Sequence, residues 1–220
     1  MSEKIQLAIF DLDGTLLDTL ADLADSVNFA LSVFGYPSRT YEEIRGFVGD
    51  GIRKLIERSV PEGTEQGAVD EVHRVFLKQY KEHCADKTKP YDGVSEVLEC
   101  LRRQGIKTAV VSNKADAAVK ELCNKYFPKL FDASVGEREG VARKPAPDSV
   151  NEILNLLSVN RLQAVYIGDS DVDIRTAENA GMACISVDWG FRDRECLKAS
   201  KAMVIISNPR ELPALIGLLP

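Results

Sequence analysis

An apolar segment that ends in two carboxylates constrains this chain more than any other feature. Residues 5–10 are largely apolar and predict a strand buried on both faces, and the sequence DLDGT follows at residues 11–15. Two carboxylates at the end of a buried strand are unfavourable unless a cation lies between them. Side chains two residues apart on an extended backbone point the same way, so Asp11 and Asp13 predict a metal site. Gly14 lets the chain turn, and Thr15 adds a hydroxyl and an amide there.

The rest of the chain separates into a helical block and a part in which strands and helices alternate. Residues 18–88 show only helical patterns, at 20–34, 41–47, 52–60 and 64–84. From residue 90 the pattern alternates between strands at 107–112, 131–135, 163–168, 183–187 and 203–206 and helices at 94–104, 114–126, 148–157, 172–180 and 209–218. Strands joined by helices require a parallel sheet with helices on both faces, and the first strand belongs in its middle. We therefore expect an α/β core of residues 1–16 and 90–220, with an all-helical domain inserted at residues 17–89.

The net charge and the cysteines indicate which binding partners and which cellular compartment to expect. The net charge of −6 argues against a nucleic-acid or anionic-membrane surface, and a small anionic ligand remains compatible with it. The five cysteines are widely spaced and form no C-x-x-C pair, as expected of reduced thiols in the cytoplasm. The first strand begins too early to leave room for a cleavable leader, and the longest apolar tracts are too short to span a bilayer. We expect a cytoplasmic monomer or small homo-oligomer.

Polar residues follow several of the predicted strands. Ser112 and Asn113 come after the strand at 107–112, Lys144 precedes the helix at 148–157, and Asp169 and Asp173 follow the strand at 163–168. Taken singly, each has an ordinary alternative as a helix cap, a surface lysine or a first-turn acid. Ligands of open parallel sheets bind beyond the carboxyl ends of the strands, so we expect these groups to converge there.

The chemistry of this set fits a phosphomonoester. A divalent hard cation prefers carboxylate oxygens, which Asp11, Asp13 and Asp169 can supply. Lys144 brings a positive charge for a phosphoryl group, and Ser112 and Asn113 bring neutral donors. An attacking carboxylate needs such positive charges because it would otherwise repel the phosphate.

The motifs DLDGT, Ser112-Asn113, Lys144-Pro145 and Gly168-Asp169 with Asp173 resemble, in order, the four motifs of the haloacid dehalogenase-like hydrolases. The resemblance implies a Rossmann-like core with a small helical cap. It also implies that Asp11 is the nucleophile, that Asp13 protonates the leaving alcohol and then activates water, and that Ser112, Asn113 and Lys144 hold the phosphoryl group. The implied Mg²⁺ ligands are Asp11, the Asp13 carbonyl and Asp169, with Asp173 in support. Dehalogenases lack the second acid of the first motif, so Asp13 favours a phosphatase or a mutase.

Two segments narrow the resemblance further. Residues 48–51 (VGDG) and 90–94 (PYDGV) look like the corresponding segments of phosphoglycolate phosphatases. Gly49 and Gly51 can bring backbone amides to a small anionic substrate and Arg53 can add a charge; alternatively, the glycines merely make a turn between two helices. We expect a Mg²⁺-dependent phosphatase, with 2-phosphoglycolate as the leading substrate. The alternatives are a sugar-phosphate mutase resembling β-phosphoglucomutase, a pyrophosphatase and, outside enzymes, a phospho-aspartate signalling module.

Overall fold

The computed structural model describes residues 4–218, so the outer ends of the first predicted domain lie outside it. The chain divides into two compact units, which are described separately. The first, which we call the core unit, has described residues 4–17 and 90–218, and the second, the helical insert, is Asp18–Lys89. Among the described residues, none of the helices combines the length and the apolar character that crossing a membrane requires.

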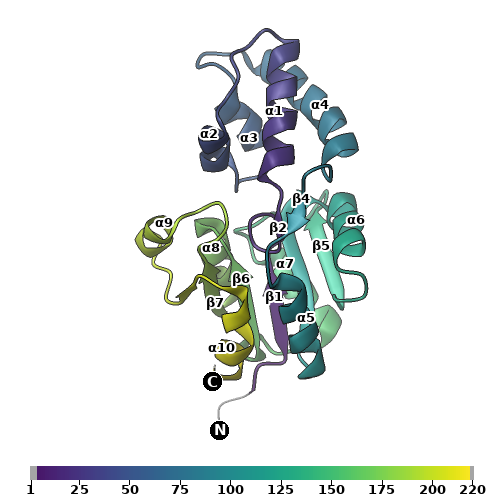
Figure 1. Cartoon of the computed structure of the whole chain (residues 1–220), viewed down its shortest axis with the longest axis vertical. Coiled ribbons are helices and arrows are strands. Elements are labelled where there is room, and N and C mark those ends of the chain that lie inside the picture. Colours follow the sequence, from purple (N-terminus) through teal and green to yellow (C-terminus); the bar gives the residue numbers. More distant parts are fainter. Residues whose placement is uncertain (1–3, 219–220) are drawn as a thin grey trace. The chain divides into compact units, whose positions relative to one another are not determined.

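The core unit contains a parallel sheet in the order β5-β4-β1-β6-β7-β8 (Figure 1). The central strand β1 (Leu7–Phe10) pairs with β4 (Lys107–Ala115) on one side and with β6 (Ala164–Gly168) on the other. The remaining strands are β5 (Ala133–Glu137), β7 (Ala183–Val187) and β8 (Ile205–Ile206). The prediction of a Rossmann-like α/β fold with the first strand in the middle of the sheet is confirmed.

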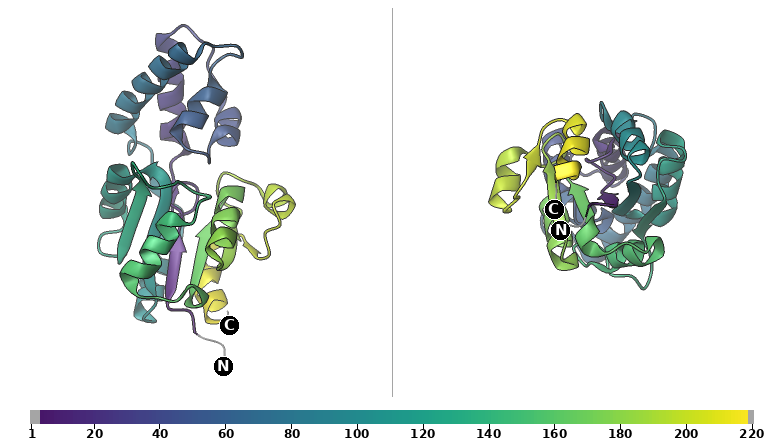
Figure 2. Two further views of the ribbon diagram at one scale, coloured as in Figure 1. Left: turned by 180° about the vertical axis from the view of Figure 1, so that it is seen from behind. Right: turned by 90° about the horizontal axis from the view of Figure 1, so that it is seen from below.

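Helices cover both faces of this sheet (Figures 1 and 2). Leu7, Ile9 and Tyr166 face one side, where they form a buried cluster with side chains of α7 and α8. Phe10 and Ile167 face the other side, toward α5 and α10, because successive side chains of a strand alternate. The helical segments of the core unit are α5 (Val94–Arg103), α6 (Asp116–Tyr126), α7 (Asp148–Leu157), η1 (Arg161–Gln163), α8 (Asp171–Ala180), α9 (Arg194–Ala199), η2 (Pro209–Glu211) and α10 (Leu212–Leu218).

The helical insert consists of α1 (Leu20–Val33), α2 (Tyr41–Phe47), α3 (Ile52–Ser59) and α4 (Gln66–His83). Helix α1 packs along α4, and Val27, Leu31, Val72 and Phe76 are fully buried between the helices of the insert. The chain enters and leaves the insert through two short strands, β2 (Leu17–Asp18) and β3 (Lys89–Pro90), which pair with each other.

Several details of the predicted elements were wrong. The strands predicted at 131–135 and 203–206 are Ala133–Glu137 and Ile205–Ile206. Lys114 was assigned to the start of a helix but lies in β4, because the ladder with β5 resumes at the pair Ala115 and Glu137. Helix α9 was not predicted, since its six residues are too few to show a periodicity.

Candidate active site

The segment after β1 folds back on itself as a tight loop. The Leu12 carbonyl accepts a hydrogen bond from the Leu17 amide at 3.0 Å, and the Gly14 amide donates to the Leu17 carbonyl at 2.9 Å. Gly14 has a φ of +85°, and a Cβ at this position would overlap the carboxylate of Asp169. Glycine is therefore required both by the backbone conformation and by this close approach. The loop holds Asp11 and its neighbours at the carboxyl end of the central strand.

Lys144 lies between two carboxylates. Its Nζ is 2.9 Å from Asp11 Oδ1 and 2.8 Å from Asp173 Oδ1, and its side chain is only 3% exposed. Burial by itself lowers the pKa of Lys144, but the negative charges of Asp11 and Asp173 outweigh burial and hold this pKa well above its ordinary value. Lys144 is therefore a permanent positive charge beside Asp11.

The side chain of Asn113 holds the backbone of Lys144. Asn113 Nδ2 donates to the Lys144 carbonyl at 3.1 Å, and the Lys144 amide donates to Asn113 Oδ1 at 2.9 Å. Both polar atoms of this side chain thus tie the loop before α7 to β4. Ser112 is nearly buried, and its hydroxyl oxygen accepts a hydrogen bond from the Lys114 amide at 3.3 Å. That bond leaves the hydroxyl hydrogen of Ser112 for another acceptor.

Asp169 is buried at the end of β6 and accepts two hydrogen bonds. The Thr15 hydroxyl donates to Oδ1 at 3.0 Å, and the Phe191 amide donates to Oδ2 at 2.8 Å. Gly190 lies so close that a Cβ there would overlap both the Asp169 side chain and the Gly14 carbonyl. The segment after β7 is therefore packed directly against this carboxylate.

Asp173 combines a structural role with its contact to Lys144. It forms a capping box with Ser170 at the start of α8, in which the Ser170 hydroxyl donates to Asp173 Oδ2 at 2.6 Å. Asp171, in the same turn, is an ordinary first-turn acid that pairs with Arg175 at 2.7 Å on the surface. The first-turn alternative therefore describes only part of what Asp173 does.

Three carboxylates of the site lie together. Asp11, Asp169 and Asp173 are buried and each offers an oxygen within 4.8 Å of the others. Burial raises the pKa of Asp11 to about 7, and Lys144 offsets only part of this effect. Burial, followed by the charges of Asp173 and Asp11, raises the pKa of Asp169 to about 8. Because the lysine balances only part of this negative charge, the donor set fits a hard divalent cation such as Mg²⁺.

The carboxylate of Asp13 points elsewhere. It pairs with Lys114, whose Nζ lies 3.0 Å from Oδ1 and 3.4 Å from Oδ2. Asp13 is therefore not among the three carboxylates that approach one another, and a metal contact through its backbone carbonyl stays a prediction.

Several residues of the site were not found from the sequence. Lys114 directly follows Asn113 in β4, but it was not considered for the site because the segment was assigned to a helix. Tyr166 reads as a core aromatic, yet its hydroxyl accepts a hydrogen bond from Lys144 at 3.1 Å. Phe191 contributes a backbone amide, for which a sequence carries no signal.

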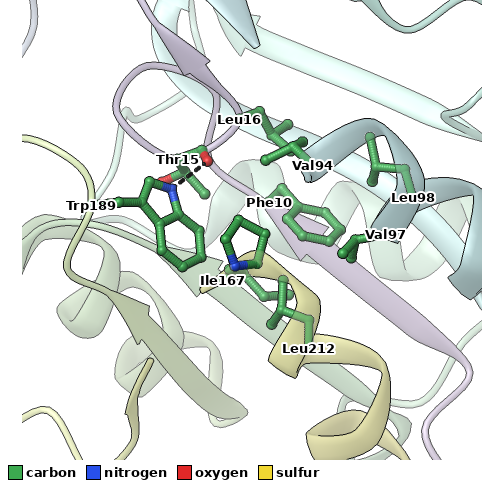
Figure 3. A pocket seen from close by; sticks show the side chains of 10 residues that line it. Phe10, Thr15, Leu16, Val94, Val97, Leu98, Ile167, Trp189 and Leu212 are labelled. Carbon is green, nitrogen blue, oxygen red and sulfur yellow. Dashed lines mark hydrogen bonds between the residues drawn. The ribbon is translucent and has the colours of Figure 1, made fainter. Parts of the chain in front are cut away.

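A small apolar cavity lies against the same loop. Figure 3 shows Trp189 beside Thr15, and the indole Nε1 donates to the Thr15 carbonyl at 3.1 Å. Phe10, Val97 and Leu212 are among the other residues that line the cavity, whose volume of about 10 Å³ is enough for about one water molecule. The indole therefore fixes the backbone of the loop at Thr15 from the apolar side.

The predicted substrate residues of the insert lie at the start of α3. Gly49 and Gly51 have φ values of 131° and 86°, and Gly51 is the N-cap of α3, so both make the turn between two helices. Arg53 pairs with Asp70 and, at 3.1 Å, with Glu57. The charge of Arg53 is thus balanced within the insert, and a contact with substrate stays a prediction.

Known proteins resemble this chain over most of its length. The family described as haloacid dehalogenase-like hydrolase matches residues 8–187, an interval that contains Asp11, Lys144 and Asp169. A phosphoglycolate phosphatase of Pseudomonas syringae pv. tomato is 30% identical over 220 residues, covering 97% of this chain and 80% of the relative. A phosphoglycolate phosphatase of Mesorhizobium japonicum is 33% identical over 205 residues, covering 90% of this chain and 89% of the relative.

A solved structure is similar over nearly the whole chain. A protein of Lactobacillus delbrueckii subsp. bulgaricus, provisionally assigned as a phosphoglycolate phosphatase, matches with a TM-score of 0.93 and 38% identity. The match covers 97% of this chain and 99% of that protein.

Proposed function

Because the chain belongs to the haloacid dehalogenase-like hydrolases, we propose that it removes phosphate from a small phosphomonoester with Mg²⁺ and an aspartyl phosphate on Asp11. The chain is a phosphatase, as the family and the phosphoglycolate phosphatases that match it indicate. The leading substrate is 2-phosphoglycolate, on which those relatives act by name.

One observation carries the proposal. The buried Lys144 ammonium lies 2.9 Å from an Asp11 oxygen at the end of the central strand. A carboxylate that attacks phosphorus approaches a group of its own charge, and a fixed cation at this distance lowers that repulsion. The network of Asp173, Tyr166 and Asn113 keeps the ammonium in place, so it does not have to reorganise during the reaction.

We propose two steps. In the first, Asp11 bonds to phosphorus, the ester bond breaks, and Asp13 gives its proton to the departing alkoxide oxygen. In the second, water attacks the phosphoryl group, Asp13 takes its proton, and phosphate leaves as the Asp11 carboxylate is restored. Asp11, the Asp13 backbone carbonyl and Asp169 would hold the Mg²⁺, which would neutralise negative charge on the phosphate oxygens. We assign the phosphoryl group as the acceptor of the Ser112 hydroxyl hydrogen, since the Ser112 oxygen already accepts the Lys114 amide.

Substrate choice is assigned to the insert. A helical cap can exclude larger phosphates and water, and we propose this role for residues 18–89. The small phosphorylated metabolite is the partner that the chemistry requires. The proposed compartment is the cytoplasm, in which widely spaced cysteines without a C-x-x-C pair are expected to stay reduced.

A substrate panel tests the proposal. The purified chain is supplied with 2-phosphoglycolate, sugar phosphates, nucleotides and pyrophosphate, with Mg²⁺ or after exhaustive chelation, and free phosphate and isomerised sugar phosphate are both measured. We expect Mg²⁺-dependent phosphate release that is fastest with 2-phosphoglycolate. The variant Asp11→Asn is expected to fold and to lose turnover by about 10³-fold or more.

The other outcomes are distinct. Isomerised sugar phosphate without free phosphate would assign a mutase, and phosphate from pyrophosphate alone would assign a pyrophosphatase. A single turnover that leaves a stable phosphoprotein would assign a signalling module. Full activity of Asp11→Asn would remove the nucleophile from the proposal.

A further inference from the structure

The buried ammonium of Lys114 has no place in the reaction described so far. Its side chain is 3% exposed, and its Nζ lies 3.0 Å from Asp13 Oδ1. The Asp13 side chain is 17% exposed, so the pair is largely shielded from water. A buried lysine is unfavourable without an opposite charge, and the structure supplies that charge from the first motif.

The pairing of β4 with β5 is irregular around Lys114. Beyond Val111, β4 advances four residues while β5 advances two before pairing resumes between Ala115 and Glu137. Such a bulge redirects the side chains within it. Gly136 of β5 makes room for the bend, since a Cβ there would overlap the Lys114 carbonyl. Two strands therefore depart from regular pairing at the point where Lys114 reaches Asp13.

We propose that Lys114 is a positioning residue that holds the Asp13 carboxyl group where it can exchange protons with the leaving oxygen and the attacking water. The inference rests on the proposed function, in which Asp13 carries those protons. A carboxyl group that rotates freely about its side chain spends little time within hydrogen-bond distance of the reacting oxygen. The ion pair with Lys114 restricts that rotation, and Lys114 itself touches neither the phosphorus nor the leaving group.

A double-mutant cycle tests whether Lys114 acts through Asp13. The variants are Lys114→Met, Asp13→Asn and the two together, and the measured quantity is kcat/KM for 2-phosphoglycolate. We expect a loss of about 10² to 10⁴-fold for Asp13→Asn and about 10 to 100-fold for Lys114→Met. Adding Lys114→Met to Asp13→Asn should change kcat/KM by no more than about twofold, because the group that Lys114 positions is already absent.

The leaving group supplies a readout that a merely structural role would not move. 2,4-Dinitrophenolate leaves without taking up a proton, whereas the alkoxide of 2-phosphoglycolate needs one. Lys114→Met should therefore lower kcat/KM for 2,4-dinitrophenyl phosphate by no more than about threefold, a selectivity that Asp13→Asn should share. Lys198→Met, which removes an exposed lysine of α9, is the matched control and should behave like the wild type with both substrates.

Each result decides the matter. Equal losses for the two substrates in Lys114→Met, or an undiminished effect of Lys114→Met in the Asp13→Asn background, would overturn the inference and assign Lys114 to the fold or to direct substrate binding. If Asp13→Asn itself shows no selectivity, the proposed proton carrier fails and the inference fails with it. If Lys114→Met does not fold because Asp13 loses its partner, Lys114→Arg, which keeps a positive charge but changes its position and shape, takes its place, and its losses with the two substrates are compared in the same way.

Discussion

Lys144 is the residue on which the charge balance of the site depends. It neutralises two of the buried acids, Asp11 and Asp173, and it is anchored by the hydroxyl of Tyr166. That hydroxyl in turn donates to the Val111 carbonyl at 3.1 Å, so the anchor is fixed to β4. A single lysine thereby connects the loop before α7 to three strands and to the start of α8.

Replacing Lys144 by methionine should show the effect of its positive charge on catalysis without a large change in side-chain volume. Lys144→Met keeps an unbranched side chain of similar length but removes the ammonium beside Asp11. We expect kcat/KM for the best substrate of the panel to fall by about 10²- to 10³-fold, the usual effect of losing one charge-stabilising donor. Steady-state kinetics with Lys198→Met as control checks this. A loss of less than about threefold would mean that the attack on phosphorus does not depend on this charge.

At the scale of elements, α1 is tied to the segment that leaves the insert. Asp22, in the first turn of α1, is 2% exposed. Its carboxylate accepts the Lys87 amide at 2.9 Å, the Thr88 amide at 2.8 Å and the Thr88 hydroxyl at 2.7 Å. A buried carboxylate with this many donors closes the insert on itself at the end where the chain crosses.

Removing that carboxylate should loosen the crossing. We expect Asp22→Ala to lower the free energy of unfolding by about 2 to 4 kcal/mol, because the buried Thr88 amide and the part-buried Lys87 amide lose their acceptor. Urea titration followed by circular dichroism measures the loss, and hydrogen exchange at the Thr88 amide should accelerate.

Asp25 offers a matched control on the same helix. It pairs with the Lys87 ammonium at 2.6 Å, but both side chains are about 60% exposed. Asp25→Ala should leave the urea midpoint and the Thr88 exchange rate unchanged, since exposed ion pairs contribute little. Equal effects of the two variants would contradict a special role for the buried carboxylate.

At the scale of the whole molecule, an ordinary acidic surface coexists with a buried cluster in which negative charge exceeds positive charge. The net charge of −6 says nothing about this cluster, because acids on the surface make up most of that charge. The folded chain raises the pKa of Asp11 to about 7 and that of Asp169 to about 8, mainly through burial. Folding and metal binding are therefore linked to pH through the same two groups.

This linkage predicts how stability depends on pH. Both groups have a higher pKa in the folded chain than their ordinary value of 3.8. Their contribution to the free energy of unfolding is therefore complete at low pH and is lost as the pH rises toward 8. The pKa of Lys144 is raised above its ordinary value of 10.5, so its contribution is constant over this range. For the metal-free chain we expect Tm to fall between pH 5 and pH 8, and added Mg²⁺ to raise Tm more at pH 8 than at pH 5.

Calorimetry on the wild type and on Asp169→Asn checks the prediction. The variant cannot ionise at this position. The change of its Tm with pH and the rise of its Tm on adding Mg²⁺ should therefore both be smaller than in the wild type. If the variant and the wild type gave the same slope and the same response, the buried carboxyl would not be the source of the linkage.

Local patterns in the sequence were sufficient for the sheet and for much of the site. An apolar run followed by acids, and strands separated by helix-length connections, placed β1 in the middle of a parallel sheet, because these are periodicities of neighbouring residues. Asp11, Lys144 and Asp169 were predictable for the same reason, since the carboxyl ends of parallel strands meet at one edge.

Which atoms face each other was decided only by the tertiary structure. Asp13 points to Lys114 because of a bulge in β4 that needs Gly136 on the neighbouring strand. The Asn113 side chain forms its hydrogen bond with the Lys144 backbone. The pKa of Asp169 depends on burial and on acids brought close by folding. Side-chain direction and desolvation arise from contacts between segments far apart in the chain, so a pattern of neighbours carries no record of them.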